Sequence, residues 1–235
     1  MTSLPGFFET LRYKEGKIEY FKEHMKRLEG GIKPLEIEAK PADVEKEIRD
    51  QLQKKGLERE LCRILLVVTK EKAEVLVEKY VPFPRELYVK GVTLTQTSHP
   101  DPSGSAHLKR YDRQGYNEAM QLAEQKGCVE CLCHAQGRVL ECSKANVIAL
   151  YDGQIVIPSR KDFRLPGIME QKVLERYKGK VMEGRIAWPL VPNMQLYITS
   201  SLKGLMPVKQ VDEKILTINK TSSLYKLIPE FWPFS

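Results

Sequence analysis

The chain of 235 residues is long enough for two modest domains or one large one. Its composition, 42% hydrophobic and 29% charged, is typical of a globular protein, and no apolar run could span a membrane. The net charge of +7 favours an anionic ligand, but basic and acidic residues are interleaved, as in Lys70-Glu71-Lys72, so no stripe for nucleic acid is present. Residues 1–5 do not resemble a signal peptide, and we expect a cytoplasmic protein.

The five cysteines, an odd number, argue against a disulfide framework. Cys128, Cys131 and Cys133, with His134, superficially resemble a zinc cluster. In an extended segment, however, Cys131 and Cys133 share one face while Cys128 lies on the other, and the chain has no second Cys-x-x-Cys pair. We therefore predict buried, reduced thiols and no metal site.

The first part of the chain predicts a sheet with helices. Two strands are predicted around a turn at residues 14–17, and an amphipathic helix is predicted where Val44, Ile48 and Leu52 recur on one face. The predicted strands cover residues 6–13, 18–21, 61–69, 73–80 and 94–98, and the predicted helices cover residues 22–28 and 42–55.

Chain breakers crowd residues 99–105, which we predict to be a linker between a domain at residues 1–98 and one at residues 106–235. Beyond the linker, helices are predicted at residues 112–126 and 168–177, and strands at residues 129–133, 140–150, 154–157, 195–199 and 215–218. The mixture predicts an α+β fold in two parts, with an active site between them.

Two blocks of the second part carry the most informative chemistry. Glu141 and Asn146 place a lone carboxylate and an amide just before an apolar run, and Leu165-Pro166-Gly167-Ile168 is a turn that opens a helix. The N–H groups of Ile168 and Met169 at that helix start could bind a phosphate. A ligand with a phosphate at one end and a protonatable nitrogen at the other would use both blocks. Pyridoxal phosphate is such a ligand.

Two cations could serve the same ligand. Pyridoxal phosphate requires a lysine for covalent attachment, and Lys109 follows the predicted linker, next to other cations that could lower its pKa. From spacing alone, Lys109 is one lysine among many. Arg27 lies in a predicted helix, where a solvated cation is the simpler interpretation. Neither residue is identified by its local pattern alone.

Hydroxyl groups provide further candidates. Ser200 and Ser201 follow a predicted strand and could form a second phosphate cradle, with a plain turn as the alternative. Phe8, Thr10 and Arg12 alternate on one strand face, because side chains in a strand repeat with a period of two. A face with a hydroxyl and a guanidinium could bind a carboxylate or could simply be solvated.

In this order, the blocks resemble the fold-type IV enzymes that depend on pyridoxal phosphate. That family contains branched-chain aminotransferases, D-amino acid aminotransferases and 4-amino-4-deoxychorismate lyases. The resemblance covers residues 7–208 and rests on six blocks in the family's order. They are Phe8-Glu9-Thr10-Leu11-Arg12, His24-Met25-Lys26-Arg27-Leu28, Lys109 before a helix, Glu141-x-Ser143-x-Ala145-Asn146, Leu165-Pro166-Gly167-Ile168, and Tyr197 to Gly204 followed by Pro207-Val208.

The resemblance implies a smaller N-terminal α/β domain and a larger C-terminal pseudo-barrel domain that flank the cofactor, in a homodimer. It implies that Lys109 holds the cofactor and moves protons, that Glu141 pairs with the pyridine nitrogen, and that Arg27 clamps the phosphate. The implied cofactor-binding residues are Arg27, Lys109, Glu141, Asn146, Ile168, Met169, Ser200 and Ser201, and the implied substrate-binding residues are Phe8, Thr10, Arg12 and Arg63.

Within the family, the residues favour 4-amino-4-deoxychorismate lyase, which releases pyruvate and forms 4-aminobenzoate, a folate precursor. Met169 stands where many aminotransferases of the family have a hydroxyl residue. Gln114 stands where branched-chain aminotransferases have a tyrosine that contacts the ring hydroxyl, so this contact has no assigned residue. An aminotransferase of the branched-chain or D-amino acid type is the alternative, and a member without catalytic turnover is a third hypothesis.

One departure from the family concerns the start of the sequence. Members usually begin with an extra strand and an acidic Gly-Asp-Gly loop before the Phe-Glu-Thr block, and residues 1–6 contain neither. We therefore expect altered domain packing or an altered dimer interface.

Overall fold

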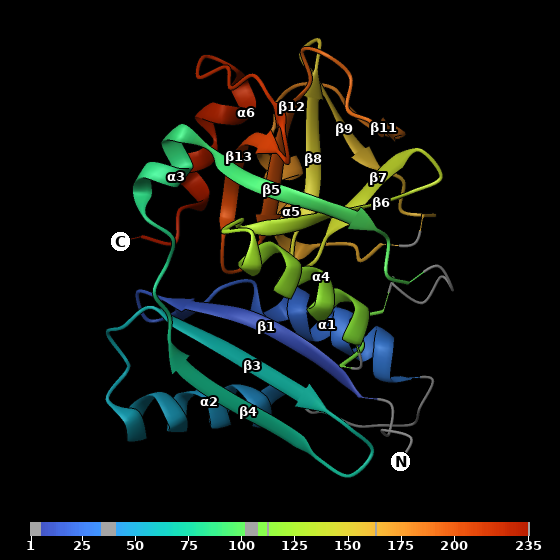
Figure 1. Cartoon of the computed structure of the whole chain (residues 1–235). Helices are drawn as coiled ribbons and strands as arrows, with labels where there is room; N and C mark the ends of the chain where they lie inside the picture. Colours follow the sequence, from blue (N-terminus) through green and yellow to red (C-terminus); the bar gives the residue numbers. More distant parts are fainter. Residues whose placement is uncertain (1–5, 34–40, 102–107, 112, 163, 235) are drawn as a thin grey trace. The chain divides into compact units, whose positions relative to one another are not determined.

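A computed structural model describes residues 6–33, 41–101, 108–111, 113–162 and 164–234 (Figure 1). The chain forms two compact units. The first comprises Met1–Pro82, Leu108–Arg113 and Pro233–Ser235, and the second comprises Phe83–His107 and Gln114–Trp232. The domain boundaries expected at residues 98 and 106 stay a prediction, and residues 102–105 of the predicted linker lie outside the described residues.

The first unit is an antiparallel sheet with two helices. The sheet has four strands in the order β2-β1-β3-β4. Its elements are β1 (Phe7–Lys14), β2 (Lys17–Ile18), α1 (Phe21–Ile32), α2 (Pro41–Lys55), β3 (Cys62–Val68) and β4 (Ala73–Lys79). Leu11 of β1 and Ile64 of β3 belong to the same buried cluster as Met25 of α1 and Ile48 of α2. Both helices therefore cover the same face of the sheet.

The predicted strand at residues 18–21 is wrong beyond Ile18. β2 contains only Lys17–Ile18, and α1 begins at Phe21. Tyr20 has a left-handed backbone with φ of 53°, which turns the chain from the hairpin into the helix. Strand periodicity over so few residues does not reveal such a turn, because the apolar side chains of Ile18 and Phe21 suit either structure.

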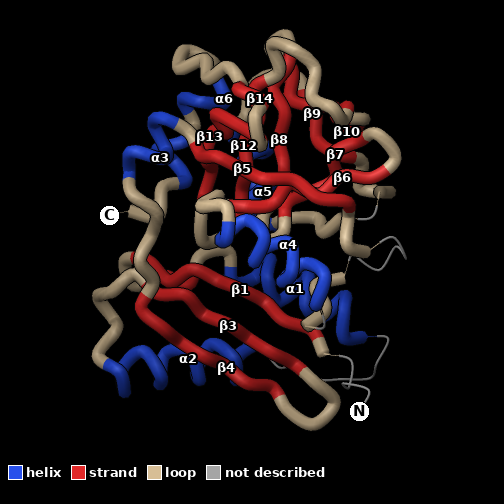
Figure 2. The backbone as a smooth tube through the Cα atoms, viewed as in Figure 1, coloured by secondary structure: helices blue, strands red, loops and turns tan. Residues whose placement is uncertain are grey.

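The second unit is built on a sheet of ten strands (Figure 2). The strand order is β10-β9-β8-β12-β13-β5-β6-β7-β11, and β14 pairs with β13. The strands are β5 (Val92–Ser98), β6 (Glu130–Ala135), β7 (Arg138–Cys142), β8 (Asn146–Tyr151), β9 (Gln154–Pro158), β10 (Val181–Gly184), β11 (Ile186–Ala187), β12 (Gln195–Ser200), β13 (Gly204–Val211) and β14 (Lys214–Ile215). The helices are α3 (Arg85–Lys90), α4 (Gln114–Gln125), α5 (Ile168–Arg176), α6 (Ser223–Lys226) and the 3-10 helix η3 (Ile228–Phe231).

The larger sheet is nearly closed and barrel-shaped. Contacts of β9 with β7 and with β11 bring the two ends of the strand order together. β8 is buried from Asn146 to Leu150, because both of its faces are covered. The α+β class and the combination of a small N-terminal sheet with a larger barrel-like sheet are confirmed. None of the helices in the described residues is long and apolar enough to cross a membrane.

The predicted single strand at residues 140–150 is wrong, because it is two strands, β7 and β8. Between them, the Cys142 N–H donates to the Ala145 carbonyl at 2.7 Å, so the backbone turns at residues 143–145. Sequence reasoning also missed α3 and β13. β13 contains Pro207, which ordinarily argues against an interior strand.

Candidate functional site

In the first unit, residues 109–111 lie along the start of β1. The Phe8 N–H donates to the Lys109 carbonyl at 3.0 Å, and the Tyr111 N–H donates to the Gly6 carbonyl at 2.8 Å. These bonds place Lys109 beside Phe8, with its Nζ 4.7 Å from the centre of the Phe8 ring. An aromatic face attracts an ammonium group at such distances. The structure thus brings together two of the predicted site residues.

Arg27 of α1 is held by a buried carboxylate. Its Nε donates to Glu9 Oε1 at 2.7 Å and its Nη2 donates to Glu9 Oε2 at 2.6 Å. His24 Nδ1 lies 2.7 Å from the same Oε2. Burial alone would raise the pKa of Glu9, but the charge of Arg27 and hydrogen bonds from Arg27 and His24 outweigh it and lower the pKa to about 2. Glu9 therefore fixes the plane of the Arg27 guanidinium.

Two predicted substrate residues, Arg12 and Arg63, lie side by side on neighbouring strands of the sheet. They occupy paired positions in the register of β1 and β3. Thr10, two residues before Arg12 on β1, lies on the same face of the sheet. The Arg12 Nε donates to Glu19, and Arg63 Nη1 lies 3.8 Å from Glu78 Oε2. Arg12 is buried, whereas the Arg63 side chain is 40% exposed. This face of the first unit concentrates two guanidinium groups, which suits a carboxylate ligand.

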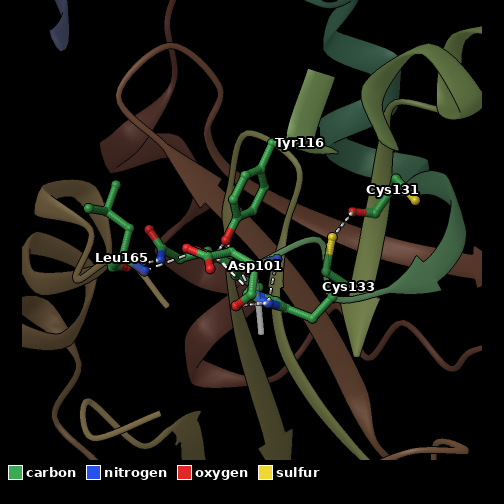
Figure 3. A network of polar contacts seen from close by, with 8 residues as sticks. Asp101, Tyr116, Cys131, Cys133 and Leu165 are labelled. Atoms are coloured by element: carbon green, nitrogen blue, oxygen red, sulfur yellow. Dashed lines mark hydrogen bonds and ion pairs between the residues drawn. The ribbon is translucent and has the colours of Figure 1, made fainter. Parts of the chain in front are cut away.

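In the second unit, Glu141 at the end of β7 is the centre of a buried polar group. Two of its partners, Tyr116 and Leu165, are labelled in Figure 3. The Tyr116 hydroxyl donates to Glu141 Oε1 at 2.6 Å, and His99 Nε2 lies 3.3 Å from the same oxygen. The Leu165 N–H donates to Oε2 at 3.1 Å. Burial and the neighbouring Glu141 charge raise the pKa of Tyr116, so its phenol stays protonated and donates.

Asn146 binds the other backbone polar group of Leu165. Its Nδ2 donates to the Leu165 carbonyl at 2.6 Å. Gly167 lies against the same amide, and a β-carbon there would stand only 1.9 Å from Asn146 Oδ1. The two blocks found in the sequence are therefore physically joined. Glu141 accepts from the N–H of Leu165 while Asn146 donates to its C=O, which fixes the turn that opens α5.

The start of α5 presents backbone N–H groups. Gly167 precedes the helix without a side-chain cap, and Ile168 and Met169 open it. The first N–H groups of a helix have no partner within the helix and favour an anion. α5 packs against β12, which ends at Ser200, and Ser201 follows in the turn. The predicted phosphate-binding residues of this unit therefore belong to two elements that pack against each other and to the turn that follows one of them.

A buried ion pair spans the turn before α5. Arg164 Nη1 donates to both oxygens of Glu170, at 3.1 and 2.8 Å, and Arg164 Nε donates to the Pro158 carbonyl at 2.8 Å. Burial raises the pKa of Glu170 by more than the Arg164 charge lowers it. The pair ties the chain before the turn to the first turn of α5, so the helix start is held on both sides.

Sequence reasoning missed Tyr116 and His99 as parts of this site. A signal for Tyr116 existed, because it precedes Ala119 by three residues and Ala123 by seven, and both alanines are buried on α4. Helical periodicity therefore directs Tyr116 toward the core side of α4. His99 gave no comparable signal, since it stands among chain breakers.

The cysteine-rich strand β6 is packed in the interior. Cys131 and Cys133 are buried, and the Cys133 thiol donates to the Cys131 carbonyl (Figure 3). A hydrogen bond with Cys131 and burial raise the pKa of Cys133, which keeps it a neutral thiol. Within the part of the chain that the structure describes, no three His, Cys, Asp or Glu side chains are grouped as metal ligands.

Comparison with known proteins places these features in a family. The family model described as amino-transferase class IV matches residues 6–211, which confirms the resemblance to fold-type IV enzymes found in the sequence. A solved protein described as "Putative 4-amino-4-deoxychorismate lyase", from Legionella pneumophila subsp. pneumophila str. Philadelphia 1, is 20% identical. It matches over 96% of this chain and 90% of its own, with a TM-score of 0.79.

Two solved aminotransferases are similarly related. The T.th. branched-chain amino acid aminotransferase, complexed with N-(5'-phosphopyridoxyl)-L-glutamate, is 22% identical over 96% of this chain and 84% of its own, with a TM-score of 0.80. A fold IV-transaminase from Curtobacterium pusillum is 18% identical over 98% and 86%, with a TM-score of 0.81. At these identities the likeness establishes the fold and leaves the reaction open.

Proposed function

Because the chain belongs to the class IV aminotransferase family, whose members use pyridoxal phosphate, we propose that it is a 4-amino-4-deoxychorismate lyase. Such an enzyme releases pyruvate and forms 4-aminobenzoate. The observation that carries a cofactor-dependent function is the clamp on Leu165, in which Glu141 and Asn146 hold both backbone polar groups of one residue, its N–H and its C=O. The clamp holds a buried carboxylate of β7 against the turn that opens α5.

The residues of the second unit fit the two polar ends of pyridoxal phosphate. Among the described residues, Glu141 Oε2 accepts a single N–H, and a carboxylate oxygen can accept two, which leaves an acceptor for a protonated ring nitrogen. The phosphate end would meet the N–H groups of Ile168 and Met169, together with the hydroxyls of Ser200 and Ser201.

Each side chain has a role that follows from its chemistry. When bound, the cofactor ring supplies an electron sink for the bond that breaks at the substrate. Lys109 would bind the cofactor and carry a proton to and from the substrate carbon with its Nζ. Glu141 would keep the ring nitrogen protonated, because a carboxylate next to a protonated base favours the charged form. Arg27, fixed by Glu9, would face the phosphate.

Substrate charge is the argument for the lyase. Its substrate is a dianionic amino acid, and the first unit places Arg12 and Arg63 opposite each other on the face that also carries Thr10. Met169, in place of a hydroxyl residue at the start of α5, supports the same assignment. An aminotransferase acting on a simple amino acid is the second candidate, supported by the family itself and by the solved aminotransferases of the same fold.

The experiment that tests the proposal combines cofactor binding and product release. The purified protein with pyridoxal phosphate should show a visible absorption band, and borohydride should attach the cofactor irreversibly to Lys109. Aminodeoxychorismate should then yield pyruvate and 4-aminobenzoate in equal amounts. Lys109→Ala should lose both the band and turnover, whereas Lys90→Ala, an exposed lysine of α3, should keep them.

The contrary outcomes identify the alternatives. A band without pyruvate release, together with conversion of the cofactor to its amine form by a simple amino acid, would establish the aminotransferase. No band at all would support a member without turnover. We also propose that the protein acts as a homodimer, as the family resemblance implies, and light scattering in solution tests this assembly.

A further inference from the structure

Glu130, the first residue of β6, is fully buried at 0% exposure and binds two other segments. Lys203 Nζ donates to Glu130 Oε1 at 2.7 Å. The Lys144 N–H donates to Oε2 at 3.0 Å, and the Ser143 hydroxyl donates to the same oxygen. One carboxylate thus joins the start of β6, the break between β7 and β8, and the turn between β12 and β13.

Both of the joined segments lie beside predicted cofactor-binding residues. Glu141 and Asn146 stand on either side of the break at residues 143–145. Ser200 and Ser201 begin the turn that contains Lys203, and the Lys203 N–H donates to Ser200 Oγ at 3.3 Å. The register of β8 and β12 already aligns these strands, but register alone does not fix the conformation of the turns at their ends. Glu130 therefore connects the two turns, through Lys203 on one side and through Ser143 and Lys144 on the other.

Stability alone is a weak explanation for this ion pair. Removing two charges from water has a large free-energy cost. Proteins in which apolar side chains of similar volume replace a buried ion pair are often equally stable. Such a pair does, however, impose one geometry, because each oxygen of Glu130 has its own donor. A turn held in one geometry is what a phosphate cradle requires, since N–H and O–H donors must point at the same small anion.

We propose that Glu130 and Lys203 are positioning residues that set the Ser200–Ser201 turn for the phosphate end of the cofactor. The inference rests on the proposed function, because it assumes that pyridoxal phosphate binds here. In this proposal, neither residue would touch the cofactor. Glu130 acts through Lys203, and Lys203 acts through the backbone of the turn that carries the two serines.

The test compares the affinities of pyridoxal phosphate and pyridoxal, which lacks the phosphate, for the same variants. Lys203→Met and Glu130→Gln should weaken pyridoxal phosphate binding about tenfold, a typical effect of losing an outer support of a ligand site. Binding of pyridoxal should change little. Lys203→Arg should restore part of the selectivity for the phosphate, because a guanidinium can still reach a carboxylate.

Lys126→Met is the matched control. Lys126 also forms an ion pair within the second unit, with Asp212 at 3.4 Å, but its side chain is half exposed and it contacts neither turn. For Lys126→Met, the ratio of the affinities for pyridoxal phosphate and for pyridoxal should equal that of the wild type. Because Glu130→Gln could fail to fold, Ser143→Ala provides a milder variant, which removes one donor to Glu130 and keeps the ion pair. It should lower the ratio in the same direction by a smaller factor.

Equal losses for both ligands would overturn the inference, since they would indicate a general structural role. An unchanged ratio in Lys203→Met and Glu130→Gln would overturn it as well, while wild-type binding of pyridoxal phosphate would leave the proposed function intact. Failure of the wild type itself to bind pyridoxal phosphate would overturn the proposed function and this inference together.

Discussion

Asn146 occupies the space that a side chain at position 167 would need, since a β-carbon on Gly167 would stand 1.9 Å from Asn146 Oδ1. The same amide donates through Nδ2 to the Leu165 carbonyl. The glycine is therefore required by close approach, because its backbone φ of −80° is open to any residue. Asn146 and the glycine together shape the turn from which α5 starts.

Gly167→Ala should displace Asn146 and break its bond to Leu165. We expect about a tenfold or greater loss of pyridoxal phosphate affinity, because the N–H groups at the start of α5 would no longer point to one place. Gly184→Ala is the control, since a β-carbon there meets only Val156 at an ordinary 3.6 Å. Titration of the visible cofactor band measures both. Wild-type affinity in Gly167→Ala would show that the clamp does not shape the phosphate site.

Tyr116→Phe removes the shortest hydrogen bond to Glu141. A hydrogen bond to a charged group contributes about 1.5–3 kcal/mol, so the carboxylate should become less well held. We expect weaker cofactor binding and a shift of the absorption spectrum, because Glu141 would contact the ring nitrogen in a different geometry. Tyr177→Phe is the matched control, as its hydroxyl donates to the Gly153 carbonyl instead. Identical spectra for the two variants would contradict a positioning role for Tyr116.

Glu9→Gln should change the dependence of stability on pH. The pKa of Glu9 is lowered from 4.5 to about 2 in the folded protein, so the unfolded chain takes up the proton first as the pH falls. The stabilisation, about 3 kcal/mol for such a shift, is complete above the unfolded pKa and disappears as the pH falls through the folded one. The wild type should therefore exceed Glu9→Gln in stability at pH 7, and the difference should close toward pH 2.

Urea denaturation at several pH values measures this difference. His24 acts in the same direction, because burial lowers its pKa and the unfolded chain protonates first below 6.5. Glu45→Gln is a control, since Glu45 pairs with Arg49 on the exposed face of α2. A stability difference between the wild type and Glu9→Gln that stays constant from neutral to acidic pH would show that the charge of Glu9 is not what stabilises the first unit.

Arg63→Ala should raise the KM for an anionic substrate and leave kcat little changed. Arg63 is 40% exposed and lies opposite Arg12, and its contact with Glu78 is long at 3.8 Å and exposed, so a carboxylate ligand can compete for its charge. We expect about a tenfold rise in KM at low salt and a smaller rise at high salt, because ions screen exposed charges. Arg49→Ala, an exposed arginine of α2, should leave KM unchanged. A fall in kcat with constant KM would exclude a role in substrate binding.

The sequence determined the family and most of the secondary structure. The apolar run of β3 and the spacing of Val44, Ile48 and Leu52 are local patterns, visible in neighbouring residues alone. The blocks around Glu141 and Leu165 were recognisable because their residue types and order are specific. The short turn at residues 143–145 was not recognisable, since it contains neither a glycine nor a proline.

Only the tertiary structure decided which polar groups meet. Glu141 is hydrogen-bonded to Tyr116 of α4 and to the backbone of Leu165. Glu130 forms an ion pair with Lys203, which is 73 residues away in the sequence. Such contacts depend on strand order and register, in which β8 lies beside β12 and β5 lies between β13 and β6. Local pattern carries no information about which strands will be neighbours. The sequence by itself therefore determined the chemistry available to this protein, and the packing of the barrel-like sheet decided which carboxylate holds which turn.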